Sequence, residues 1–306
     1  MRLIFAGTPD AAVPSLDALA ASAHDIVAVI TRADAPMGRK RVLTPSPVAV
    51  AADARGLEVI RANRLGEDLT GRVADLRPDL GVIVAYGGLV REPLLSTPRH
   101  GWINLHFSLL PAWRGAAPVQ RALMAGDTDT GASVFQLEAG LDTGPVFATV
   151  SRSTGPGETA GDVLAALAHD GAALLTSVVN DLAAGTARST AQLGDPTLAP
   201  KLTLDDGRLD FTRPVAEVDA RLRGVTPEPG AFTTVGGQRL KVLAAAPVAG
   251  GDPLPPGRLA LRDRRVLVGT ATDPLALDTV QPAGKRPMPA ADWWRGLPDQ
   301  HGVTAE

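Results

Sequence analysis

The sequence predicts an α/β domain with a parallel sheet and helices on both faces, followed by a smaller β-barrel domain. Short apolar runs alternate with helical patterns over residues 1–185, which is typical of parallel strands joined by crossover helices. Residues 186–204 are polar, contain prolines and lack periodicity, as a linker would. Over residues 205–306, short strand-like segments recur between Gly-Gly and Pro-Pro pairs, which is typical of a small barrel.

The elements of the first domain follow from hydrophobic spacing. Near-continuous apolar runs predict buried parallel strands at residues 2–6, 25–31, 80–85 and 102–105. Alternating patterns at 132–138 and 146–152 predict two strands of a mixed or antiparallel edge. Helical patterns are expected up to about residue 21, at 67–76 and at 159–184.

In the second domain, residues 215–224 read as one helix that precedes the barrel. The strand-like segments that follow lie at residues 230–234, 240–245, 257–261, 266–269 and 275–280. Glycine and proline pairs separate them and mark the turns.

Composition limits the classes of function. A chain of 306 residues can bury a substantial core, and its net charge of −3 gives no global field that would attract nucleic acid. The absence of cysteine excludes disulfides, thiolate nucleophiles and Cys-ligated zinc. No signal sequence is recognised at the N-terminus, and no apolar run is expected to reach the ~18–20 residues of a membrane span. We therefore expect a cytoplasmic protein.

The segment NLHFSLLPAWRGAAP, residues 104–118, is too irregular for a helix or a strand interior. Asn104 and His106 lie at or just past the carboxyl end of a predicted strand, where open α/β sheets place ligands. On an extended segment both side chains point the same way. An amide donor beside an imidazole suits an oxyanion on a carbonyl centre, and imidazole can pass a proton near neutral pH. A hydrogen-bonded loop histidine is the alternative.

A second polar interruption, AGLDTGP, carries Asp142. As a buried carboxylate it would fix the tautomer of His106 and raise the pKa of the imidazole. It could also accept, directly or through water, the proton of an attacking amine. Asp beside Thr and Gly is equally a common turn residue.

Three other segments are candidates for binding. Ser108, Leu109, Leu110 and Pro111 offer apolar walls and backbone amides for a flat heterocycle, and Tyr86 and Gly87 after the strand at 80–85 have the same standing. The fingerprint G-x-G-x-x-G is missing after the first strand, which argues against a dinucleotide cofactor. The loop at 34–47 carries the basic run Arg39, Lys40 and Arg41, which suits either solvent or a nucleic-acid end.

Taken together, the motifs FAGTPD, GRKR with PSPV, VAYG, NLHFSLLPAWRGAAPVQRAL and AGLDTGP resemble the methionyl-tRNA formyltransferases, a family of folate-dependent formyltransferases. The similarity covers essentially the whole chain, to GKRPM near Lys285. It implies a Rossmann-like formyltransferase domain and an oligonucleotide-binding-like barrel that binds tRNA. It also implies transfer of the formyl group of 10-formyltetrahydrofolate to the α-amino group of methionyl initiator tRNA.

The resemblance assigns residues as well. It places the catalytic Asn, His and Asp on Asn104, His106 and Asp142. The folate segment falls on Ser108, Leu109, Leu110 and Pro111. The contact with the tRNA acceptor end falls on the basic run, with Arg39 the best match for the key arginine. Phe107, where many relatives have Gly, departs from the pattern.

We expect no metal, because the amide and imidazole donors meet the charge that develops, and we expect a monomer. The main alternative is a folate-dependent formyltransferase that acts on a nucleotide or an amino sugar; one that acts on water is a further variant. A nucleotide-binding protein without catalysis would leave Asn104, His106 and Asp142 unused as a set. An oxidoreductase is disfavoured by the missing glycine fingerprint.

Overall fold

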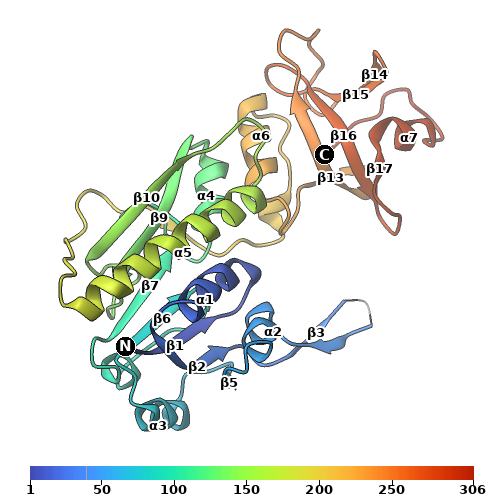
Figure 1. Cartoon of the computed structure of the whole chain (residues 1–306). Helices are drawn as coiled ribbons and strands as arrows, with labels where there is room; N and C mark the ends of the chain where they lie inside the picture. The colour runs from blue at the N-terminus through green and yellow to red at the C-terminus, as the bar shows by residue number, and fades with distance from the viewer. Residues whose placement is uncertain (39) are drawn as a thin grey trace. The chain divides into compact units, whose positions relative to one another are not determined.

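A computed structural model describes residues 1–38 and 40–306 of the chain. Its contacts divide these residues into two compact units, which we describe separately (Figure 1). Unit 1 comprises Met1–Pro118, Asp129–Arg152 and Leu164–Ala199, and unit 2 comprises Val119–Thr128, Ser153–Val163 and Pro200–Glu306. Each unit is therefore assembled from segments that are distant in the sequence.

Unit 1 is built on a mixed sheet with the strand order β10-β9-β7-β6-β1-β2-β5. The strands are β1 (Arg2–Gly7), β2 (Asp25–Thr31), β5 (Val59–Arg61), β6 (Leu80–Val84), β7 (Trp102–His106), β9 (Asp129–Gln136) and β10 (Val146–Ser153). Strands β5, β2, β1, β6 and β7 pair in parallel, whereas β9 runs antiparallel to β7. The α/β class and the antiparallel edge are confirmed.

The parallel strands are buried on both faces. Ile4 and Ile30 belong to a core cluster that also contains Leu69 and Val73 of α3 (Glu67–Leu76). Trp102 of β7 belongs to the same cluster. Leu105 of that strand points to the other face of the sheet, because side chains alternate along a strand. There it packs against Gly171 of α5 (Ala160–Ala184). The remaining helices are α1 (Val13–Ala20), α2 (Pro47–Asp53) and α4 (Pro118–Ala125), the last of which lies mostly in unit 2.

Helix α5 corrects one expectation. By length and composition alone it could cross a membrane, because an 18-residue window reaches a mean hydropathy of 1.4. The prediction that no apolar run would reach the length of a span is therefore wrong. In this structure 44% of that window is buried within the protein. Leu167, Leu175 and Val179 are among the fully buried side chains of α5.

Unit 2 contains an antiparallel sheet in the order β12-β13-β16-β15-β14. Its strands are β12 (Phe232–Val235), β13 (Gln238–Pro247), β14 (Leu259–Arg262), β15 (Arg265–Val268), β16 (Leu275–Pro282) and β17 (Met288–Pro289). Helices α6 (Val215–Gly224) and α7 (Ala290–Arg295) pack on the same core, to which they contribute Leu222 and Trp294.

The last residues of the chain join the two edges of this sheet. The backbone of Val303 and Ala305 pairs with Leu259 and Gly257 beside β14. The backbone of Glu306 exchanges two hydrogen bonds with Thr234 of β12. Residues 303–306 thereby close the sheet into a ring, which is how the predicted barrel is formed.

Candidate active site

Strand β7 places Asn104 and His106 on one face of the sheet, together with Trp102. Asn104 pairs with Ile83 of β6 on one side and with Phe135 of β9 on the other. Asn104 is partly exposed, whereas His106, the last residue of the strand, is only 6% exposed. The two side chains therefore lie at the carboxyl end of a central strand, and the imidazole is shielded from water.

The hydrogen bond to Trp113 fixes the neutral tautomer of His106. Its Nε2 lies 2.9 Å from the carbonyl oxygen of Trp113. A carbonyl can only accept, so Nε2 carries the hydrogen. In the neutral ring Nδ1 is then a lone-pair acceptor, and it faces Oδ2 of Asp142 at 3.9 Å.

Two opposing effects act on this imidazole. Burial lowers the pKa of His106 from its ordinary value of 6.5 and is the largest effect. The carboxylate of Asp142 and the bond to Trp113 both raise that pKa, by less. The result is a histidine that is neutral in the free protein near pH 7, with a carboxylate ready to stabilise a proton on Nδ1.

Asp142 is brought to His106 by the loop between β9 and β10. Its backbone has φ of +50°, in the left-handed region, and its side chain is buried. Oδ2 accepts a hydrogen bond of 2.7 Å from the backbone N–H of Gly115. The structure thus joins the two loops that the sequence left separate, through one carboxylate oxygen that faces both Gly115 and His106.

The segment 108–111 is held by its own hydrogen bonds. The hydroxyl of Ser108 donates to the carbonyl of Ala112 over 2.6 Å. Ser133 of β9 accepts from the N–H of Leu110 and donates to the carbonyl of Ser108. Leu109, Leu110 and Pro111 are half-buried. The segment therefore offers a shaped apolar surface, whereas the hydroxyl of Ser108 is already engaged.

Tyr86 and Gly87 differ in what they expose. The ring of Tyr86 is buried in the core of unit 1, and its hydroxyl donates to the carbonyl of Ala62 over 3.0 Å. This burial raises the pKa of the Tyr86 hydroxyl. Gly87 is exposed with φ of +80°. Gly87 presents its backbone to solvent, whereas the side chain of Tyr86 anchors the loop in the core.

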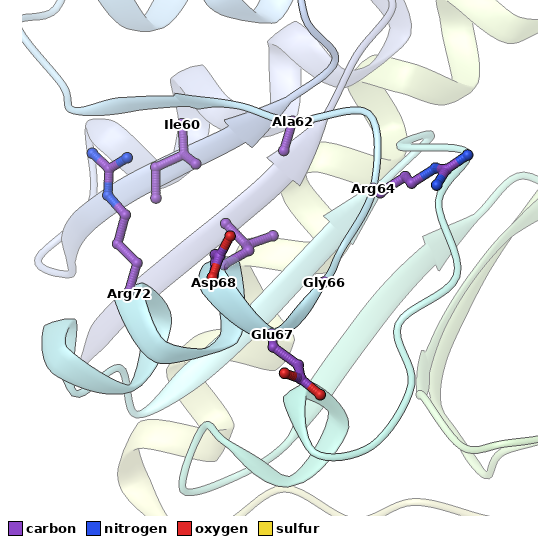
Figure 2. A pocket seen from close by; sticks show the side chains of 8 residues that line it. Ile60, Ala62, Arg64, Gly66, Glu67, Asp68 and Arg72 are labelled. Atoms are coloured by element: carbon purple, nitrogen blue, oxygen red, sulfur yellow. The ribbon is translucent and has the colours of Figure 1, made fainter.

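A hollow of about 590 Å³ lies between the end of β5 and the first turn of α3 (Figure 2). It is lined by residues of β5, of α3 and of the segment that joins them: Ile60, Ala62, Arg64, Gly66, Glu67, Asp68, Leu69 and Arg72. None of the predicted site residues that the structure describes lines it. Ala62, which does line it, accepts a hydrogen bond through its carbonyl from the hydroxyl of Tyr86.

The basic loop forms a hairpin of β3 (Ala35–Met37) and β4 (Val42–Thr44). Lys40 and Arg41 are exposed at its turn, and Arg41 has φ of +50°. Arg39 lies outside the described residues. The hairpin also exposes apolar side chains, among them Leu43 at 67%.

Sequence reasoning missed the residues that support this centre. Trp113 and Gly115 act through backbone groups, which no residue type reveals. Gln192 lies in the segment that was predicted to be a linker, yet its side-chain amide donates to the backbone of the Asp142 loop. A single Gln in a polar segment gives no signal.

Within residues 1–38 and 40–306, no group of three or more His, Asp or Glu side chains is arranged to hold a metal ion. Whether the chemistry proceeds without a metal stays a prediction.

Comparisons with known proteins agree on the family. The family model described as "Formyl transferase" matches residues 1–179, and that described as "Formyl transferase, C-terminal domain" matches residues 201–298. A methionyl-tRNA formyltransferase of Clavibacter sepedonicus is 65% identical over 297 residues, 97% of each chain. Another, from Arthrobacter sp. (strain FB24), is 56% identical over the full length of both.

Solved structures show the same fold at low identity. An N-formyltransferase from Helicobacter canadensis, in complex with folinic acid and dTDP-3-aminofucose, superposes with a TM-score of 0.70. It is 15% identical and covers 90% of this chain and 98% of its own.

Proposed function

The chain belongs to the methionyl-tRNA formyltransferases and formylates methionyl initiator tRNA with a formyl-folate, and from this premise we propose that Asn104, His106 and Asp142 form its reactive centre. The observation that carries the proposal is the buried approach of the His106 imidazole to the Asp142 carboxylate. Asn104 lies two residues before His106 on the same face of β7. Such a set occupies the position where open sheets bind ligands.

The donor set fits a folate that carries a formyl group. We propose 10-formyltetrahydrofolate, which supplies an activated formyl carbon when bound. Ser108, Leu109, Leu110 and Pro111 would hold the flat ring through apolar and backbone contacts, and the backbone of Tyr86 and Gly87 would flank it. Asn104 offers the neutral N–H donors that an oxygen on that carbon needs.

One proton must leave the methionyl amine, and one must reach the folate nitrogen that departs. Nδ1 of His106 is suited to accept the proton of the amine and to pass a proton to the folate nitrogen, because Nε2 already holds a hydrogen that is directed at Trp113. Asp142 stabilises the positive charge that this transfer creates. We therefore assign the oxyanion chiefly to the amide of Asn104, and the proton to His106.

The experiment is formyl transfer to charged initiator tRNA by an Asn104→Leu variant, which removes the amide at similar volume. Loss of one oxyanion donor lowers kcat about 100- to 1,000-fold. The matched control is Asn180→Leu, on the exposed side of α5, which should leave kcat unchanged. A loss confined to KM would contradict the assignment of Asn104. Preferred transfer to an amino sugar or a nucleotide would favour the alternative acceptor class.

For the tRNA we propose the basic run Arg39, Lys40 and Arg41 as a contact with the acceptor end. The exposure of Lys40 and Arg41 supports this. Lys40→Ala should raise KM for tRNA and reduce the slope of log KM against log salt by about one unit, since one phosphate contact is lost. An effect on KM for folate alone would show that the basic run serves another purpose.

We further propose that residues 1–185 act as the catalytic domain, 186–204 as the connection and 205–306 as the tRNA-binding barrel. The match of separate family models to residues 1–179 and 201–298 supports this division. We propose that the protein works as a cytoplasmic monomer, without a membrane or a metal. Sedimentation of the purified chain measures whether it is a monomer, and activity after exhaustive chelation measures whether it needs a metal.

A further inference from the structure

Gln192 makes four hydrogen bonds at the edge of the candidate site. Its Nε2 donates to the carbonyl of Asp142 and to the carbonyl of Gly144, each over 2.8 Å. Its Oε1 accepts from Nε and Nη2 of Arg114, over 3.1 and 2.7 Å. A side-chain amide has two N–H donors and two acceptor lone pairs, so its full capacity is used. Such an amide has only one productive orientation.

Together with a bond from Gly115, these bonds hold both the backbone and the carboxylate of Asp142. Arg114 precedes Gly115, whose N–H binds the Asp142 carboxylate. The same two residues form β8 (Arg114–Gly115), which pairs with β11 (Leu198–Ala199), six to seven residues after Gln192. The backbone of Asp142 is thus held through Gln192, and its carboxylate is held through Gly115, from one short β-ladder.

The loop needs this support. Asp142 has a left-handed backbone conformation, which is unfavourable for a residue with a Cβ. The two carbonyls that Gln192 binds belong to Asp142 itself and to the residue two positions later. Gln192 therefore restrains the backbone that determines where the carboxylate points.

We propose that Gln192, oriented by Arg114, is a positioning residue that holds the Asp142 carboxylate against His106 for formyl transfer. This inference rests on the proposed role of Asp142. Gln192 itself touches no reacting atom in this scheme. Its effect is exerted on the geometry of the pair, and displacement of a catalytic group by about 1 Å can cost up to about 100-fold in rate.

Two substitutions distinguish the hydrogen bonds that Gln192 donates to the Asp142 loop from those that it accepts from Arg114. Gln192→Ala removes all four bonds. Gln192→Glu keeps an acceptor for Arg114 but replaces the two donors by a carboxylate that faces two carbonyl oxygens. We expect about a 10-fold lower kcat for Gln192→Ala, at least as large a loss for Gln192→Glu, and little change in KM for tRNA. Full activity of Gln192→Glu would overturn the proposal.

A control variant tests whether the effect is merely structural. Arg2 of β1 also makes two side-chain hydrogen bonds, to the carboxylate of Asp25 and to the carbonyl of Leu76. Arg2→Ala therefore removes side-chain bonds of the same unit without touching the Asp142 loop. It should lower the melting temperature while kcat stays near that of the wild type.

The decisive measurement is a double-mutant cycle on kcat with Asp142→Ala. If Gln192 acts through the carboxylate, Gln192→Ala should cause no further loss once that carboxylate is gone. Losses that multiply would overturn the inference and leave the proposed reactive centre standing. A near-normal kcat of Asp142→Ala alone would instead refute the role of Asp142, and with it the inference.

The pH profile gives an independent readout. The Asp142 carboxylate raises the pKa of His106. If Gln192→Ala lets that carboxylate move away, the acid limb of kcat should shift to lower pH, whereas Arg2→Ala should not shift it. An acid limb that is identical in wild type and Gln192→Ala would contradict a displaced carboxylate.

Discussion

His106 is a buried imidazole whose two ring nitrogens face different groups. Nε2 donates to a carbonyl, and Nδ1 faces a carboxylate at 3.9 Å. Neutral imidazole suits the first contact, whereas a protonated ring suits both. The ring can therefore bind a proton on Nδ1 while Nε2 keeps its hydrogen bond to Trp113.

The first prediction concerns this imidazole. His106→Ala should lower kcat about 100-fold or more, since general acid–base catalysis contributes about 10²- to 10⁴-fold. Single-turnover formylation at saturating folate measures the effect. The circular dichroism spectrum should match that of the wild type, and a rate within a few-fold of the wild type would contradict the assignment.

The second prediction concerns stability against pH. Folding lowers the pKa of His106 from 6.5, so the unfolded chain binds more protons than the folded chain as pH falls below about 6.5. The free energy of unfolding must then decrease as pH falls through that region. Denaturant titrations of wild type and His106→Asn at pH 7.5 and 5.5 measure it. The wild type should lose more stability than the variant, and equal losses would contradict a depressed pKa.

At the residue scale, the sequence was sufficient to select side chains by their functional groups. Asn104, His106 and Asp142 could be chosen because these groups suit a carbonyl reaction, and their catalytic roles stay a prediction. It was insufficient for Trp113 and Gly115, whose backbone groups hold the site and have no signature in residue type. Phe107 is buried, at 6% exposure, so its ring packs inside the protein.

At the scale of elements, the Asp142 loop is confined by close backbone contacts. A Cβ on Gly144 would lie 1.8 Å from the carbonyl oxygen of Gln136, the last residue of β9. The N–H of Gln136 also binds the carbonyl of Pro145 over 2.9 Å. The loop therefore returns tightly onto the strand that it leaves, and this return sets the position of Asp142.

The third prediction follows from that contact. Gly144→Ala should destabilise the protein by about 1–3 kcal/mol or more, because the backbone must shift to admit the methyl group. It should also lower kcat, since Asp142 moves with the loop. The control is Gly71→Ala in α3, where nothing lies within 4 Å of the added Cβ. That change should stabilise the helix by up to about 1 kcal/mol, and a neutral Gly144→Ala would show a looser loop.

Elements with long, regular patterns were predicted well. The strand at residues 25–31 and the helices at 67–76 and 215–224 have the predicted bounds. The short elements were missed. Helix α2 had a usable signal, because Ser46 caps it by accepting from the N–H of Ala49 and Pro47 occupies its first position. The pairing of β8 with β11 left no signal in the sequence, since two-residue strands have no periodicity.

At the scale of the whole molecule, both units depend on segments that return from far along the chain. Unit 1 includes residues up to Ala199, which lie within the segment predicted to be a linker. Unit 2 includes Val119–Thr128 and closes its sheet with residues 303–306. Composition could mark where the chain changes character but could not show these returns, because they depend on backbone pairing.

The fourth prediction tests the closure of the barrel. Deletion of residues 303–306 removes four backbone hydrogen bonds, to Gly257, Leu259 and Thr234, each worth about 1 kcal/mol net. It also exposes the edges of β12 and β14. Calorimetry should show unit 2 unfolding at a lower temperature, whereas Thr304→Ala, which keeps the backbone bonds, should not. An unchanged transition would mean that the ring is not held at this point.

The bond from Gln192 to Asp142 spans 50 positions in the sequence, and this has a consequence for how the protein is made. A ribosome adds about 5–20 residues per second, so the Asp142 loop is synthesised roughly 3–10 s before the side chain that restrains it. During that interval the Asp142 loop lacks the two hydrogen bonds that Gln192 donates to it. The site becomes complete only after residue 199 has left the exit tunnel of the ribosome, so a chain stalled earlier carries Asn104, His106 and Asp142 without the support of Gln192 and of the β8–β11 pairing.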